Sequence, residues 1–236
     1  MTLDLLHAEP TLFELPPLPV PDAGEARMIE RHQPDDSPIP ADVFAGLPMF
    51  GFDLIMIDPP WPYRTFSHKG QDKAAAKHYR TWTIDRIKRL PVGHLASRDC
   101  ALFMWCCSPL MLDPDRPSYS PTGDVLEAWG FRYGAIGGWA KRTVNDKLRW
   151  GPGYVVRSVM EPWIVATTGT LDHSKGAANL INGLAREHSR KPEAAYRWCE
   201  KYMPKARRIE LFSRTDRPGW TTWGDEAGKF NGGETT

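Results

Sequence analysis

The sequence has few cysteines, no long apolar run and almost no net charge, and each shortage excludes a class of protein. The four cysteines among the 236 residues match no metal-binding spacing, so we expect neither a disulfide nor a metal site. No stretch approaches the roughly 18 apolar residues of a membrane helix. The first residues lack the basic region of a secretory signal. We therefore expect a cytoplasmic protein without contact to a membrane.

Charge and composition narrow the class further. The formal net charge of +1 argues against a protein that coats nucleic acid nonspecifically, but it is compatible with an enzyme that has a local basic groove. The content of 41% hydrophobic and 25% charged residues is typical of a globular protein with one sizeable core.

Proline density divides the chain into three parts. Residues 1–45 are rich in proline and acidic side chains and show no helical or strand periodicity, which predicts an extended or partly disordered arm. Residues 46–230 contain the predicted globular domain. Residues 231–236 are expected to form a flexible tail.

Within the domain, short apolar runs alternate with helix-like segments, which predicts an α/β fold with a mainly parallel sheet and helices on both faces. The expected strands are Phe52–Ile57, Ala101–Trp105, Tyr133–Trp139, Trp163–Thr167 and Arg208–Phe212. The expected helices are Ile84–Leu90, Gly123–Trp129 and Pro192–Met203, with Pro192 in the first turn and Gly130 ending the middle helix.

The most informative motif is Asp58-Pro59-Pro60-Trp61, directly after an apolar strand candidate. In open α/β sheets, ligands bind at the carboxyl ends of strands. The prolines fix their own φ angles, so their carbonyls can be held rigidly. The alternative is that Asp-Pro-Pro only forms the turn that ends the strand.

This motif suits the methylation of an adenine amine, whose lone pair is delocalised into the ring. The Asp58 carboxylate and the Pro59 carbonyl can accept the two amine hydrogens and localise that lone pair. Pro60 keeps the turn rigid, and Trp61 or Tyr63 can stack on the base and hold it in line with the methyl group.

Several blocks together resemble one known family. Asp58–Trp61 resembles the D-P-P-W signature of amino-group methyltransferases, and the wider chain is similar to the MT-A70-like adenine-N6 methyltransferases. The resemblance covers Phe52 to Glu226 and includes the blocks Ser189–Glu193, Arg208–Arg214 and, less strongly, Trp223–Glu226. It implies a Rossmann-like methyltransferase fold in which the catalytic motif precedes the cofactor-binding motif, with S-adenosylmethionine as methyl donor and no metal.

The resemblance also implies cofactor-binding residues. The lysine that matches Lys191 holds the methionine carboxylate in the family, and a lysine beside a helix N-terminus is suited to a carboxylate. A solvated lysine is the alternative. Family contacts at the end of the last expected strand map onto Glu210, Phe212 and Arg214, although Glu210 can instead be a structural acid. Asp225 and Glu226 stand where the eukaryotic enzyme has Asn and Gln near the ribose.

Three basic stretches, 64–80, 141–157 and 186–191, flank the expected site; the first two contain interleaved aromatic residues, and the third contains His188. Such segments suit phosphate contact and base stacking, although a solvated surface is the alternative. The candidate substrate-binding residues are Tyr63, Lys69, Tyr79, Trp82, Arg149 and His188. An adenine in a duplex would have to be flipped out to reach Asp58.

The sequence therefore predicts a DNA adenine-N6 methyltransferase of bacterial or phage type, in a restriction–modification system or as an orphan enzyme. The same reaction on RNA is the nearest alternative. Two others stay open: a non-catalytic pseudo-methyltransferase subunit, and a methyltransferase for small-molecule or protein amines. The resemblance also implies a possible homodimer.

Overall fold

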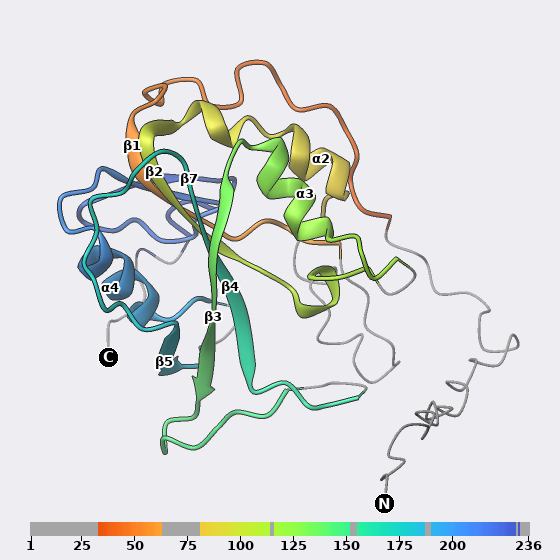
Figure 1. The fold of residues 1–236 in the computed structure, drawn as a ribbon, viewed down its shortest axis with the longest axis vertical. Coiled ribbons are helices and arrows are strands. Elements are labelled where there is room, and N and C mark those ends of the chain that lie inside the picture. Colours follow the sequence, from red (N-terminus) through yellow and green to blue (C-terminus); the bar gives the residue numbers. More distant parts are fainter. Residues whose placement is uncertain are drawn as a thin grey trace, which may run out of the picture. The chain divides into compact units, whose positions relative to one another are not determined.

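The computed structural model describes residues 33–62, 81–113, 116–151, 155–186, 190–229 and 231. These form a seven-stranded sheet with the order β5-β3-β4-β2-β1-β6-β7 (Figure 1). The strands are β1 (Phe52–Ile57), β2 (Ala96–Trp105), β3 (Arg132–Arg142), β4 (Met160–Thr167), β5 (Leu180–Leu184), β6 (Arg208–Leu211) and β7 (Trp220–Trp223). The α-helices of the described residues are α2 (Ile84–Arg89), α3 (Pro121–Ala128) and α4 (Glu193–Tyr202). Within these ranges no helix is long and apolar enough to span a membrane.

Strand direction decides what gathers at each edge of the sheet. β4 runs antiparallel to both its neighbours, β2 and β3, whereas the other four strand pairs are parallel. The amino end of β4 consequently lies at the same edge as the carboxyl ends of β1, β2, β3 and β6. The sheet is mixed but mainly parallel, as expected for a Rossmann-like α/β fold.

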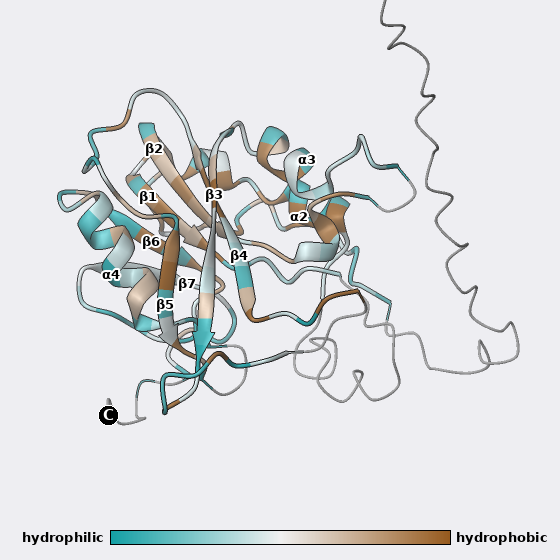
Figure 2. Ribbon diagram, turned by 60° about the horizontal axis from the view of Figure 1, so that its bottom comes forward, coloured by the Kyte–Doolittle hydropathy of each residue, from teal (hydrophilic) through white to brown (hydrophobic). Residues whose placement is uncertain are grey.

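Alternate side chains of β1 pack into two separate cores, one on each face of the sheet. Ile55 and Ile57 belong to the core under α2 and α3, and Leu54 and Met56 to the core under α4. Since side chains of a strand alternate between faces, this is the pattern of a strand covered on both sides. Figure 2 shows β1 and β2 as mostly hydrophobic, whereas α4 carries several hydrophilic turns.

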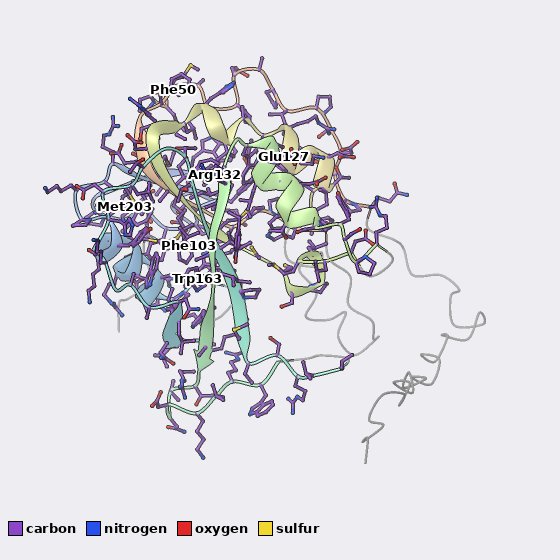
Figure 3. All side chains as sticks on the ribbon, in the orientation of Figure 1. Phe50, Phe103, Glu127, Arg132, Trp163 and Met203 are labelled. Atoms are coloured by element: carbon purple, nitrogen blue, oxygen red, sulfur yellow. The ribbon has the colours of Figure 1, made fainter. Side chains whose placement is uncertain are left out.

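Aromatic rings fill the core on the α4 side. Phe103 and Trp163, on the neighbouring strands β2 and β4, stack with ring centroids 4.8 Å apart (Figure 3). The ring centroid of Trp198, on α4, lies 5.0 Å from that of Trp163. These large side chains fix the position of α4, and therefore of the lysine that precedes it, against the sheet.

Local signals place the helix ends close to their expected positions. The Thr83 hydroxyl accepts a hydrogen bond from the Arg86 amide at the start of α2, and Ser120 caps α3 in the same way. Gly130 has a φ of +78° and ends α3, as predicted. Pro192 is the N-cap residue of α4, with extended backbone, so this helix begins one residue later than expected.

Residues 33–50 pack along the domain. The Asp35 carboxylate pairs with Arg86 of α2, and the Trp223 indole donates to the Val43 carbonyl over 3.1 Å. This segment therefore packs against Trp223 of β7. Residues 1–32 of the predicted arm and 232–236 of the predicted tail lie outside the described residues.

Candidate active site

Charged side chains from four elements meet at the edge where the strand ends converge. Asp58 directly follows β1, Lys141 lies near the carboxyl end of β3, Glu161 lies at the amino end of β4 and Lys191 precedes α4. Asp58 and Lys191 were predicted from the sequence to lie in one site. The reversed direction of β4 is what adds Glu161 to it.

These four side chains alternate in sign. The Lys191 Nζ lies 3.2 Å from Asp58 Oδ2 and also pairs with Glu161 Oε1. The other Glu161 oxygen, Oε2, lies 2.8 Å from Lys141 Nζ. The Lys191 side chain is only 9% exposed, and its ammonium lies 4.8 Å from the centre of the Trp105 ring. Lys191 is thus a nearly buried cation held between two carboxylates and an aromatic face.

The two carboxylates respond differently to this environment. Burial raises the pKa of Asp58, the charge of Lys191 opposes that rise, and the charge of Glu161 adds to it. Burial acts upward on the pKa of Glu161 too, but Lys191 and Lys141 together outweigh it and hold that pKa below its ordinary value. Glu161 is therefore the more firmly ionised acid, and Asp58 is the better proton acceptor.

The two prolines of the motif use their carbonyls within the fold. Pro59 accepts a hydrogen bond of 2.8 Å from the Trp61 amide, and Pro60 accepts one of 2.8 Å from the Trp82 amide. A carbonyl oxygen has a second lone pair, so Pro59 keeps acceptor capacity toward a ligand.

Trp61 lies in the core beneath the motif. Its side chain is 3% exposed, and its indole Nε1 donates a 2.9 Å hydrogen bond to the Trp105 carbonyl. A ring this buried presents almost no face to a base. The structure thus places the Trp61 ring in the core beneath the motif, where it cannot serve as a stacking surface for a base.

Two candidate residues from distant segments contact each other. The ring of Trp82, a predicted substrate residue, meets the ring of Phe212, a predicted cofactor residue, edge-on with centroids 5.2 Å apart. Phe212, directly after β6, has a φ of +60°. Residues other than glycine rarely adopt this backbone conformation. The backbone at Gly224 approaches Phe212 so closely that a Cβ there would lie 3.0 Å from the Phe212 Cα.

Glu210 is satisfied inside the protein. Its carboxylate accepts hydrogen bonds of 2.8 Å from the Tyr196 hydroxyl and 2.8 Å from the Ser213 hydroxyl. Burial raises its pKa, although both hydrogen bonds oppose the rise. These contacts favour the structural alternative for Glu210 over direct cofactor contact.

The remaining cofactor candidates lie at the segment after β7. Arg214 Nε lies 3.1 Å from Glu226 Oε2, and Glu226 also pairs with Lys229. Asp225 is exposed beside them. The charge of Arg214 also acts on Asp58 and lowers its pKa slightly against the larger effect of burial, so this pair lies near the charged edge.

Of the predicted substrate residues, Trp82 and Arg149 fall within the described residues. Arg149 is exposed on the connection between β3 and β4, where its guanidinium donates to the Ala185 carbonyl over 3.3 Å. Within the described ranges no cluster of three or more His, Cys, Asp or Glu side chains is arranged to hold a metal. The candidates outside the described residues are Tyr63, Lys69, Tyr79 and His188.

This edge, with an acid after a central strand and a buried lysine before a helix, belongs to a methyltransferase domain. The MT-A70 family model matches residues 52–226, which include all four charged residues of the site. The chain is therefore a member of the MT-A70 family.

Individual relatives extend the comparison. The chain is 29% identical to the type II methyltransferase M.MunI of Mycoplasma sp over 205 residues, which covers 78% of this chain and 82% of that one. It is 28% identical to the N6-methyladenosine RNA methyltransferase MTA1 of Pyricularia oryzae, covering 76% of this chain and 48% of the relative. It is 27% identical to the non-catalytic subunit METTL14 of Drosophila melanogaster, covering 76% and 47%. The chain thus spans about half the length of these last two relatives.

Proposed function

We propose that this chain transfers a methyl group from S-adenosylmethionine to the 6-amino group of adenine in DNA. One observation carries the proposal: the motif acid Asp58 and the buried Lys191, from blocks far apart in sequence, lie 3.2 Å apart at the edge where strand ends converge. An acceptor suited to an amine thus lies next to a cation suited to a carboxylate, and this pairing supports the proposal.

The chain's own residues suit the cofactor. Lys191 is a nearly buried ammonium beside the N-terminus of α4, and Pro192, the N-cap residue, has no side-chain acceptor for the first amides of the helix. An ammonium together with helix amides is suited to the methionine carboxylate. When bound, the cofactor supplies a methyl group on a positively charged sulfur. Arg214 and Glu226 are proposed to lie at its nucleoside end.

Asp58 is proposed to perform the chemistry on the amine. Its carboxylate accepts one amine hydrogen, and the Pro59 carbonyl accepts the other, which localises the nitrogen lone pair. The nitrogen must lose a proton once it carries the methyl group. A carboxylate whose pKa is raised by burial is a better acceptor for that proton than a solvated one.

The connection between β3 and β4 is proposed to contact the nucleic acid. Arg149, Trp150 and Arg157 lie on it, with Trp150 58% exposed and the Arg157 guanidinium 5.3 Å from the centre of the Trp150 ring. An exposed aromatic ring beside exposed cations is suited to a base and its phosphates. Trp82 stays a predicted contact of the nucleic acid, as do Tyr63, Lys69, Tyr79 and His188, which lie outside the described residues.

Two alternatives differ by target or by activity. M.MunI, a type II methyltransferase, matches over 82% of its length, whereas the RNA methyltransferase MTA1 of Pyricularia oryzae is matched over 48%; the more complete match supports DNA. METTL14 is a non-catalytic relative, so a binding subunit is a second candidate. The presence of Asp58 beside Lys191 favours catalysis.

The test uses tritiated S-adenosylmethionine with duplex DNA, single-stranded DNA and RNA, followed by digestion and identification of the labelled nucleoside. We expect label in 6-methyldeoxyadenosine for the wild type and for Asp172→Asn, a control at an exposed acid. Label only in RNA would overturn the target. Cofactor binding without transfer to any substrate would favour the binding subunit.

A further inference from the structure

Two of the four charged side chains at this edge, Lys141 and Glu161, have no part in the proposed reaction. Lys141 lies on β3, and its ammonium is 2.8 Å from Glu161 Oε2 and 5.2 Å from the centre of the Trp139 ring. Its backbone is fixed on both sides: its amide donates to the Val159 carbonyl over 3.0 Å, and its carbonyl accepts from the Arg149 amide over 2.8 Å. Lys141 is therefore a cation with a fixed backbone position, and Glu161 lies between it and Lys191.

Glu161 forms ion pairs with both Lys191 and Lys141. It is 20% exposed, and a carboxylate this buried needs a partner charge to stay ionised. In the structure it has two, one on each oxygen. Lys191, however, also faces Asp58 and, by the proposed function, the cofactor carboxylate. The Lys191 ammonium would then be the counter-ion of three carboxylates, those of Glu161, Asp58 and the cofactor.

We propose that Lys141 is a positioning residue of the methyl-transfer site: it supplies the counter-charge that keeps Glu161 satisfied when Lys191 turns to the cofactor carboxylate. Without Lys141, Glu161 keeps Lys191 as its own partner and competes with the cofactor for it. The inference rests on the proposed function, because it takes Lys191 as the carboxylate ligand.

The surroundings of Glu161 make this competition dependent on pH. The groups that act on it are Lys191 and Lys141, and the acid Asp58 lies on the far side of Lys191. The thiols of Cys106 and Cys107 also lie close enough to feel its charge, and burial keeps their pKa values raised. Removing Lys141 leaves burial less opposed, so the pKa of Glu161 rises. Glu161 then competes for Lys191 only at a pH above that raised pKa.

The experiment measures the dissociation constant of S-adenosylmethionine by calorimetry, without nucleic acid, between about pH 5 and pH 8. For Lys141→Met we expect a dissociation constant on the order of tenfold higher at the alkaline end, with the loss shrinking toward acidic pH. Lys141→Arg keeps the charge and should bind as the wild type does. Lys205→Met, at an exposed lysine, is the matched control.

A double variant separates competition from damage. If Glu161 competes for Lys191, Lys141→Met combined with Glu161→Gln recovers most of the affinity, because the competitor is gone. A purely structural loss is not recovered by a second change. Thermal unfolding shows whether each variant is folded.

The outcomes are distinct. Wild-type protein that does not bind S-adenosylmethionine overturns the proposed function itself. Wild-type binding with an unchanged Lys141→Met, or with a loss that Glu161→Gln does not recover or that is the same at every pH, overturns the role of Lys141 and leaves the proposed function standing.

Discussion

The Tyr196 hydroxyl of α4 donates a hydrogen bond of 2.8 Å to Glu210 at the end of β6. This contact joins α4, which follows Lys191, to β6, which pairs with β1. It thereby fixes the position of Lys191 relative to Asp58 at the end of β1. Arg217 lies over the same tyrosine ring, 3.7 Å from its centre, and pairs with Glu193 in the first turn of α4 over two contacts of 2.7 Å. Arg217 therefore fixes the first turn of α4.

The first prediction concerns this contact. Tyr196→Phe removes a donor from a buried carboxylate and should lower the free energy of unfolding by about 1–3 kcal/mol, measured by urea denaturation. Because burial raises the pKa of Glu210 in the folded protein, its contribution to stability is present at acidic pH and is lost as pH rises through that pKa. Glu210→Gln should therefore gain stability relative to the wild type as the pH rises above about 4, the ordinary pKa of a glutamate. The opposite slope would contradict the account.

A second prediction concerns Asp53 at the start of β1. Hydrogen bonds from the Arg207 side chain, together with its amide and the Ser97 hydroxyl, lower the pKa of Asp53 to about 2 despite partial burial. A lowered pKa contributes stability above the ordinary value, which is lost as pH falls through the folded value. Asp53→Asn should cost about 1 kcal/mol at pH 7, since Arg207 is largely exposed, and nearly nothing at about pH 2. A cost that does not change with pH would contradict it.

A third prediction concerns Gly224. It has a φ of +153°, and an added Cβ would lie 3.0 Å from the Phe212 backbone. Gly224→Ala should therefore cost about 2–4 kcal/mol of unfolding free energy. Gly176, which has a φ of +85° but no heavy atom within 4 Å of an added Cβ, is the control, and its change to alanine should cost only about 1 kcal/mol. Equal losses would show that the approach to Phe212 is not limiting.

A fourth prediction concerns the connection between β3 and β4. Arg157→Gln should weaken binding to a DNA duplex and reduce the slope of log affinity against log salt by about 1, as expected for one lost phosphate contact. The control is Arg132→Gln, because Arg132 is exposed at the start of β3, at the opposite end of that strand from the connection (Figure 3). This substitution should leave the slope unchanged. Equal effects at both arginines would place the nucleic acid elsewhere.

Much of the fold could be predicted because its signals are local. The apolar run of β1 gave its bounds, and Gly130 marked the end of α3. β5 and β7 were missed since L-I-N-G-L and W-T-T-W contain no apolar run. Both are outer strands of the sheet, which pair along one side only.

The candidate site was only partly predictable. Asp58 and Lys191 could be found because each belongs to a motif. Glu161 and Lys141 could not, although Glu161 stands directly before an apolar run: an acid at the start of a strand faces the site only when that strand is reversed, and strand direction depends on the topology of the whole sheet. Trp61 belongs to the motif, but its ring is buried in the core under α2 and α3 and donates to the Trp105 carbonyl, and both contacts exist only once the sheet has formed.

The central claim is that the Asp58 carboxylate acts on the amine and that cofactor binding depends on Lys191. The most direct test is the single-turnover rate of methyl transfer to duplex DNA with saturating cofactor, measured for the wild type and for Asp58→Asn. We predict a fall on the order of a hundredfold or more, with the dissociation constant of S-adenosylmethionine nearly unchanged, whereas Lys191→Met should mainly weaken cofactor binding. An Asp58→Asn enzyme that transfers the methyl group at the wild-type rate would contradict the account.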